Sequence, residues 1–321
     1  MVIDFKCDTI NLGGSMDNKI AASLFGLFIG DAIGVPAKFE TRSSLVNNPI
    51  SDMVGYGTYN VPAGTWSDCS SMTIATIFSI INKKEIDCQD ITLNFIKWYQ
   101  DGTYTPFNKP FAISKSVEKS LRAHIKKINR QTYDDDNSAL MRILPVSLYC
   151  YYKKMSDAEI VKVINDVVSI THSNELTKLA CFIYTKFIEF LHLYEKKEAY
   201  QKLKEVDFST YYSNEAISQF ERILVNNINE QKLSTINSTN FVVDTLEAVL
   251  WVILNTDNFI HSIIGAINLG GDTSTIGALT GGMSGIIYGY EHIPEQWLKK
   301  LKKLDNLETI TKAYEQLLLE I

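Results

Sequence analysis

The chain has 321 residues, of which 45% are hydrophobic and 21% charged, a composition that is ordinary for a globular protein and unlike that of a disordered one. Its net charge of −6, from 31 basic and 37 acidic side chains, predicts no basic surface, so duplex nucleic acid is not expected as a partner. The 5 cysteines are scattered and lack CxxC spacing, which argues against a disulfide framework or a zinc cluster and favours a reducing compartment.

Residues 1–17 form an extension ahead of the first predicted helix. Asp4, Lys6 and Asp8 interrupt the apolar stretch that a signal peptide requires, and we find no later run of about 18 apolar residues. We therefore expect no membrane segment and a cytoplasmic location, or export by a route without a signal peptide. The extension is either a disordered terminus or a segment that contacts a partner.

Apolar residues recur at helical spacing along the rest of the chain. The repeats include Ile20, Leu24, Leu27 and Phe28, then Ile91, Phe95 and Trp98 behind Asp90, a candidate N-cap. Ser156 and Glu159 form the S-x-x-E pattern of a capping box. Further helices are predicted over 175–193, 242–254, 259–267, 275–288 and 306–320. Because period-2 alternation is nearly absent, we predict one all-α domain over 18–321, with surface loops at 126–137 and 226–240.

Three polar clusters interrupt these helices. They are G-D-A-I-G-V-P from Gly30 to Pro36, G-T-W-S-D-C-S-S-M-T over 64–73, and G-G-D-T-S-T from Gly270 to Thr275. In the third cluster, Asp272, Ser274 and Thr275 can point toward one spot ahead of a helix, where short oxygen ligands could hold a hard cation. The alternative is that Asp272 or Thr273 merely caps that helix.

Taken together, these segments resemble the ADP-ribosylglycohydrolase family over nearly the whole chain. The matching stretches are, in chain order, GLFIGDAIGVPAKFE, GTWSDCSSMT, NSALMRILP, THSNE, DTLEAVLWVIL, INLGGDTSTIGALTGGMSGIIYG and IPEQWL. The resemblance implies a compact all-α fold with a central cleft and two divalent cations at its base. It also implies hydrolysis of the bond that joins ADP-ribose to a protein side chain or a small acceptor.

The resemblance further implies a set of metal ligands, of which Ser67, Asp68, Asp272 and Thr275 are kept here. Asp68 and Asp272 are therefore the candidate catalytic residues. Whether these remnants still hold a metal depends on three positions at which this sequence departs from the family.

Lys38 lies where the family has a glutamate, Cys69 replaces an aspartate, and Ser274 replaces the aspartate that bridges the two metals. Glu40, two residues beyond Lys38, could partly replace the glutamate. Cys69 could be a nucleophile or a soft-metal ligand, but no histidine can be placed beside it from the sequence. We interpret it instead as a small filler of a vacated carboxylate position.

Only two carboxylates then face the +4 charge of two magnesium ions, and Lys38 adds a positive charge. Two like unit charges about 4 Å apart repel by roughly 4 kcal/mol at an effective dielectric constant of about 20. We therefore expect no cofactor or weakly bound Mg²⁺, with the Lys38 ammonium in the place of one metal and paired with Asp68 or Asp272. The alternative is a solvent-facing Lys38.

The ligand-binding half of the cleft matches the family more closely. The resemblance implies ADP-ribose contacts from Gly30, Asp31, Gly34, Lys38, Cys69, Asn137, Ser138, Met141, His172, Gly270, Gly271 and Ser274. His172 can instead be a hydrogen-bonded histidine at a helix start. Arg142 can hold the fold through buried contacts with carboxylates or carbonyls.

The sequence leaves three functions open. The first is a divergent family member that binds ADP-ribose or an ADP-ribosylated protein or small molecule, with metal-dependent hydrolysis weak or lost. The second is an active hydrolase with altered metal use or substrate, in which Asp68 activates water or helps to expel the acceptor. The third is an interaction protein that inhibits an ADP-ribosylating enzyme.

Overall fold

The computed structural model describes residues 18–129 and 131–321, so the predicted extension 1–17 lies outside the described residues. The α-helices are α1 (Asn18–Gly34), α2 (Arg42–Asn47), α3 (Asp68–Lys83), α4 (Cys88–Asp101), α5 (Lys115–Ile125), α6 (Leu144–Tyr152), α7 (Asp157–Ser169), α8 (Glu175–Leu193), α9 (Lys196–Lys204), α10 (Asn214–Ser218), α11 (Glu221–Leu224), α12 (Val242–Asn255), α13 (Phe259–Ile267), α14 (Thr273–Tyr288), α15 (Glu295–Lys300) and α16 (Leu304–Glu320). The short 3₁₀ turns are η1 (Val35–Ala37), η2 (Gly57–Tyr59), η3 (Leu140–Arg142), η4 (Phe208–Thr210), η5 (Ile228–Glu230), η6 (Leu233–Thr235) and η7 (Tyr290–His292). Within the described residues, β pairing is limited to two isolated bridges, so the all-α prediction is confirmed.

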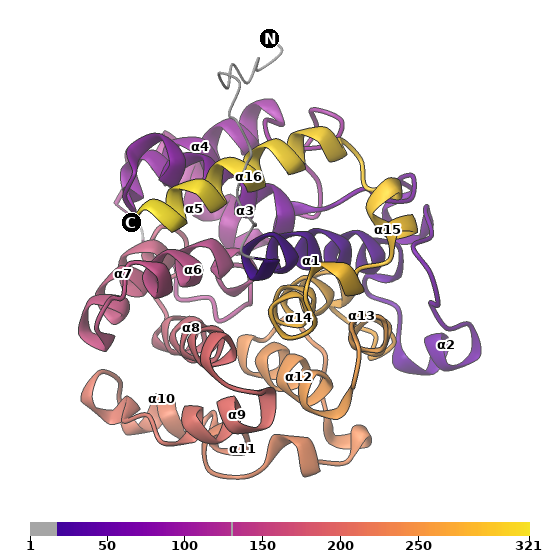
Figure 1. Ribbon diagram of the computed structural model, residues 1–321. Helices are drawn as coiled ribbons and strands as arrows, with labels where there is room; N and C mark the ends of the chain where they lie inside the picture. The colour runs from indigo at the N-terminus through magenta and orange to yellow at the C-terminus, as the bar shows by residue number, and fades with distance from the viewer. Residues whose placement is uncertain (1–17, 130) are drawn as a thin grey trace.

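The antiparallel helices α1 and α14 lie against each other at the centre of the molecule (Figure 1). Glycines on both helices bring the two backbones into direct contact. A Cβ atom on Gly30 would lie 1.9 Å from the carbonyl oxygen of Gly277, and one on Gly281 would lie 2.0 Å from that of Gly26. This glycine seam fixes the end of α1 relative to the start of α14, the two places from which the polar clusters extend.

Other helices enclose this central pair (Figure 1). The last helix, α16, packs on α1 and α3, while α12 and α13 pack against α14. The helices α9 and α10 pack on α8, and α11 packs on α9 and α12. The polar ends of α1, α3 and α14 are thereby held on a scaffold of buried apolar side chains.

The local signals at helix starts gave mixed results. The capping box is confirmed at α7, where the backbone N–H of Ser156 donates to Glu159 Oε2 at 2.8 Å. The prediction for Asp90 is wrong, because the carboxylate of Asp87 accepts from the backbone N–H groups of Gln89 and Asp90 at 2.9 and 3.0 Å. The predicted loop at 226–240 contains the turns η5 and η6.

The expectation that the chain has no apolar run of about 18 residues also needs correction, at α1. Lys19–Ala37 spans 19 residues with a mean hydropathy of 1.7, so it is long and apolar enough to cross a membrane. Asp31 interrupts the run, which is why a search for unbroken apolar sequence passes over it. The apolar 18-residue window of this segment is buried inside the protein, and a helix that is buried on all sides is apolar on all sides.

Candidate functional site

Lys38 follows η1, and its ammonium points into the protein. Its Nζ atom lies 2.9 Å from Asp272 Oδ1 and donates to Ser274 Oγ at 2.9 Å. The residue is only 7% exposed, so the solvent-facing alternative is wrong. Burial alone would lower the pKa of Lys38, but the Coulombic attraction of Asp272 and Asp68 raises it. The ammonium is therefore a fixed positive charge.

Asp272 lies at the N-cap position of α14, but its side chain makes no capping hydrogen bond. Its carboxylate instead pairs with Lys38 and accepts from Asn137 Nδ2 at 2.8 Å. Burial alone would raise the pKa of Asp272, but Lys38 and these hydrogen bonds hold it below its usual value. The simple capping interpretation therefore does not describe Asp272.

Gly270 and Gly271 shape the loop that presents Asp272. Both have left-handed backbones, with φ of 76° and 70°. A Cβ atom on Gly271 would lie 2.1 Å from the carbonyl oxygen of Ser238, and the Gly271 N–H donates to the carbonyl of Glu40 at 2.8 Å. Backbone contacts inside the protein require glycine at these positions, and the predicted ligand contact of the two residues stays a prediction.

Asp68 is the first residue of α3, and its carboxyl group is buried. Burial raises the pKa of Asp68 to about 7; Lys38 opposes this shift, whereas Asp31 and Asp272 add to it. Asp31 in α1 accepts from the backbone N–H and the hydroxyl of both Ser67 and Ser70, at 2.6 to 3.0 Å. Asp31 and Ser67 therefore fasten the start of α3 to α1.

Replacing Asp68 with asparagine should stabilise the protein more at pH 8 than at pH 5. The carboxyl group ionises near pH 4 in the unfolded chain but near pH 7 in the folded one, so the parent loses stability as the pH rises through this window. The asparagine side chain does not ionise, so the variant loses no stability for this reason as the pH rises. The advantage of Asp68→Asn in unfolding free energy, measured by urea titration, should be about 2 kcal/mol larger at pH 8 than at pH 5. An advantage independent of pH would show that Asp68 is already ionised at pH 5.

Cys69 is fully buried, and its Sγ atom lies 3.9 Å from Asp68 Oδ1. Its Sγ atom lies 3.4 Å from Met141 Sδ and 3.5 Å from Thr275 Oγ1. Burial raises the pKa of the thiol well above its ordinary value, which opposes formation of the reactive thiolate. These contacts support the interpretation of Cys69 as a filler.

Two divalent cations do not fit this set of side chains. Lys38 already donates to Asp272 and Ser274, which leaves Asp68 as the remaining carboxylate of the remnant set. Glu40, the candidate replacement, is exposed. Over 18–129 and 131–321, no group of three or more His, Cys, Asp or Glu side chains could hold a metal ion. No chemistry of this site is therefore assigned to a metal.

These side chains form one wall of a cavity of about 680 Å³, a volume typical of small-molecule sites. The sequence-predicted residues that line it are Lys38, Asp68, Asn137, Ser138, Met141, Asp272 and Thr275. The sequence missed further lining residues, which are Phe39, Tyr59, Asn240 and the segments 112–116 and 134–136. The sequence contained a signal for the segment 134–136, since three aspartates directly precede Asn137. It also contained one for Phe39, which is an aromatic residue next to Lys38.

Other predicted ligand residues lie behind the cavity wall. Gly30 and Gly34 belong to the seam between α1 and α14, where a Cβ atom on Gly34 would lie 2.5 Å from the carbonyl oxygen of Thr273. Their lack of a side chain permits the close approach of α14, and a role in ligand contact stays a prediction.

His172 is also buried behind the wall. Its Nδ1 atom lies 2.8 Å from Thr171 Oγ1, and its Nε2 atom lies 3.3 Å from Asp136 Oδ1. This matches the alternative of a hydrogen-bonded histidine just ahead of a helix. Buried Arg142 donates to Thr171 Oγ1 at 2.7 Å and lies 4.7 Å from the ring centre of Phe95, so it uses a hydroxyl and a ring instead of the expected carboxylates or carbonyls.

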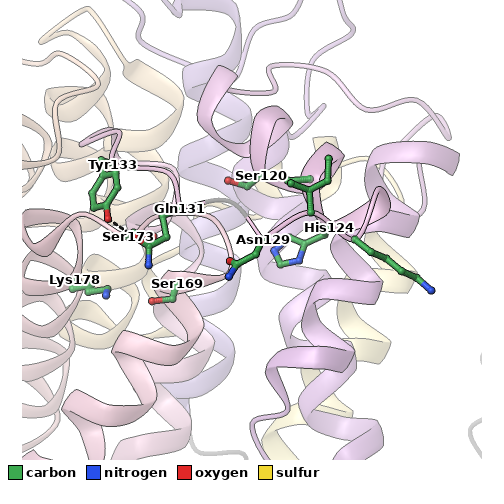
Figure 2. Close-up of a pocket in the computed structure, with 11 residues that line it drawn as sticks. Ser120, His124, Asn129, Gln131, Tyr133, Ser169, Ser173 and Lys178 are labelled. Carbon is green, nitrogen blue, oxygen red and sulfur yellow. Dashed lines mark hydrogen bonds between the residues drawn. The ribbon is translucent and has the colours of Figure 1, made fainter.

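A second cavity, of about 530 Å³, is shown in Figure 2. Ser120 and His124 reach it from α5, Asn129, Gln131 and Tyr133 from the following segment, Ser169 from the end of α7, and Lys178 from α8 (Figure 2). Its lining includes none of the residues that the sequence predicts for the site. The first cavity, with Lys38, Asp68 and Asp272, is therefore the candidate site.

Comparison with known proteins agrees with this fold. The family model for ADP-ribosylglycohydrolase matches residues 14–321. The chain is 29% identical to the ADP-ribosylarginine hydrolase Tri1 of Serratia proteamaculans (strain 568), over 91% of this chain and 78% of that protein. It is 26% identical to the ADP-ribosyl-[dinitrogen reductase] glycohydrolase of Rhodospirillum rubrum, over 90% of this chain and 92% of that protein.

A solved structure described as an ADP-ribosylglycohydrolase-related protein complex has the same fold, with a TM-score of 0.77 at 21% identity over 94% of this chain and 98% of that one. The family match and these relatives place the chain among proteins of a hydrolase class that acts on ADP-ribosyl glycosyl bonds. The chain belongs to the ADP-ribosylglycohydrolase family, as the sequence motifs predicted.

Proposed function

We propose that this protein binds ADP-ribose or an ADP-ribosylated partner in the 680 Å³ cavity, with metal-dependent hydrolysis weak or lost. One observation carries the proposal, namely the buried Lys38 ammonium at 2.9 Å from both Asp272 Oδ1 and Ser274 Oγ. A divalent cation here would either lie beside the ammonium or displace it from Asp272, and both arrangements are unfavourable. The ammonium thus replaces one metal ion as the positive charge at the base of the cavity.

The relatives suggest the kind of partner. The Serratia protein is named for ADP-ribosylarginine and the Rhodospirillum protein for ADP-ribosylated dinitrogen reductase. Because the cavity is lined by residues of the family motifs, we propose that it takes an ADP-ribosyl group joined to an arginine side chain.

The proposal predicts binding that needs no metal. ADP-ribose titrated into the protein in EDTA should give a calorimetric isotherm, and elemental analysis should find no stoichiometric divalent metal. Magnesium at 1 mM should raise the melting temperature by no more than about 1 °C, because a millimolar dissociation constant stabilises by only about 0.4 kcal/mol. A rise of several degrees that Asp272→Ala abolishes would instead reveal a working metal site.

A second candidate function is hydrolysis without a metal. The observation that favours it is the Asp68 carboxyl group in the cavity wall, whose burial raises its pKa to about 7. Such a group can donate or accept a proton near neutral pH. Release of free ADP-ribose from an ADP-ribosylated arginine peptide in EDTA, lost in Asp68→Asn, would favour this function over binding alone.

A further inference from the structure

Two aromatic side chains line the candidate site next to the Lys38–Asp272 pair. Phe39 directly follows Lys38, and Tyr59 comes from η2. Phe39 is 66% exposed, so most of its ring contributes nothing to the buried core. An apolar ring left open in the wall of a cavity is available to a ligand.

The backbone of Phe39 is fixed despite this exposure. Its φ is 71°, a left-handed conformation that is unfavourable for an aromatic residue. The Phe39 N–H donates to the carbonyl of Gly271 at 2.8 Å, and the next N–H, of Glu40, donates to the carbonyl of Ala37 at 2.9 Å. These bonds tie Phe39 to the loop that carries Asp272, so its position relative to the ion pair is set by the backbone.

Tyr59 is also held close to the turn that carries Lys38 and Phe39. Thr58 Oγ1 donates to the carbonyl of Lys38 at 2.6 Å, which joins η2 to the turn that carries Lys38. The Tyr59 ring packs against Phe111, with ring centres 5.2 Å apart. The charges of Lys38, Asp68 and Asp272 all act on the Tyr59 phenol, so this ring lies in the electrostatic field of the candidate site.

The charges select the kind of group that fits beside these rings. Asp272 neutralises Lys38, and the further charges of the lining are those of Asp68, of the aspartates at 134–136 and of Lys115, so acids outnumber bases. Aromatic faces attract cations, and a planar guanidinium can stack on them while it binds carboxylates. The Lys38 ammonium lies 5.7 Å from the ring centre of Phe39, but its charge is neutralised by Asp272.

We propose that Phe39 and Tyr59 bind the guanidinium of an ADP-ribosylated arginine and thereby select the acceptor. This inference rests on the proposed function, because the ADP-ribosyl group places the arginine in the cavity. The rings are specificity determinants, and no bond-breaking step is assigned to them.

The test compares two ligands across variants by calorimetry in EDTA. The parent should bind an ADP-ribosylated arginine peptide about 5- to 30-fold more tightly than free ADP-ribose, as expected for two cation–π contacts. In Phe39→Ala/Tyr59→Ala this preference should fall below about twofold, because the peptide should lose more affinity than free ADP-ribose does. Phe39→Leu should lose the preference and Tyr59→Phe should keep it, since the aromatic face is the required feature.

Phe107→Ala is the matched control, because Phe107 is 52% exposed but does not line the cavity. If the double variant weakens both ligands equally, the rings bind the adenine or a ribose and the inference is wrong. If the parent binds no ADP-ribose, the proposed function fails. The inference then fails with it, whereas a parent that binds both ligands equally tightly overturns the inference alone.

Discussion

Replacing Lys38 with methionine should lower the free energy of unfolding by about 3–5 kcal/mol, one of the two largest effects expected in this protein. The reason is that the Asp272 carboxylate, held at 2.9 Å from the ammonium, would remain buried without its counter-charge. Methionine fills similar space, so the loss reports on charge more than on packing. Urea unfolding at pH 7 measures it.

Two further variants make this test specific. Lys38→Met combined with Asp272→Asn should recover much of the loss, because it removes the unpaired charge, and the two changes should be strongly non-additive. Lys186→Met is a matched control, since Lys186 is equally buried but its partners Asp157 and Glu189 reach the solvent and can be hydrated. Equal losses at Lys38 and Lys186, or additive effects at Lys38 and Asp272, would contradict the role given to the buried pair.

The triple variant Lys38→Glu, Cys69→Asp and Ser274→Asp should create a divalent metal site. Without metal it should be less stable than the parent, because five carboxylates would then meet at the base of the cavity. Magnesium at 1 mM should restore about 3 kcal/mol if the new site has a dissociation constant near 10 μM. Melting curves with and without magnesium measure this recovery, and hydrolysis of an ADP-ribosylated substrate is the accompanying readout.

Each single change should have little effect on magnesium binding, because the Lys38 ammonium remains or at least one carboxylate ligand is still missing. The non-additivity of the three changes is thus part of the expected result. A folded triple variant that binds no metal would show that more than these three positions separates this protein from the metal-binding pattern. Rapid turnover by the parent in EDTA would show that the site performs chemistry of its own.

The sequence predicted the helices well because their apolar faces repeat over many residues, as in α8 and α13, whose bounds match the expected 175–193 and 259–267. It misplaced the cap of α4 because Asp87 and Asp90 are both acidic and lie one turn apart. A periodic pattern indicates that a helix exists, but the hydrogen bonds at its first turn decide where it begins.

For the site, the sequence identified Lys38 and Asp272 but could not choose between Asp68 and Asp272 as the partner of the ammonium. The contact of α1 with α14 decides between them, because it brings Lys38 next to Ser274 and Asp272, although Lys38 and Ser274 are 236 residues apart in the sequence. The glycines of α1 were assigned to a ligand because a missing side chain permits close approach by any partner, whether a ligand or a helix. Tyr59 escaped notice because only the folded chain places it in the same wall as Lys38.

The contact of α1 with α14 also bears on how the chain is made. During synthesis α1 emerges early, with an apolar surface on every side, and its partner begins only at Thr273. At common elongation rates this leaves roughly 10 to 50 seconds in which the glycine stripe of α1 has no helix to cover it. The Lys38 ammonium likewise has no counter-ion until Asp272 has been added. Binding of the nascent chain by a chaperone is therefore expected to centre on the first helix, and the candidate site is among the last parts of the molecule to form.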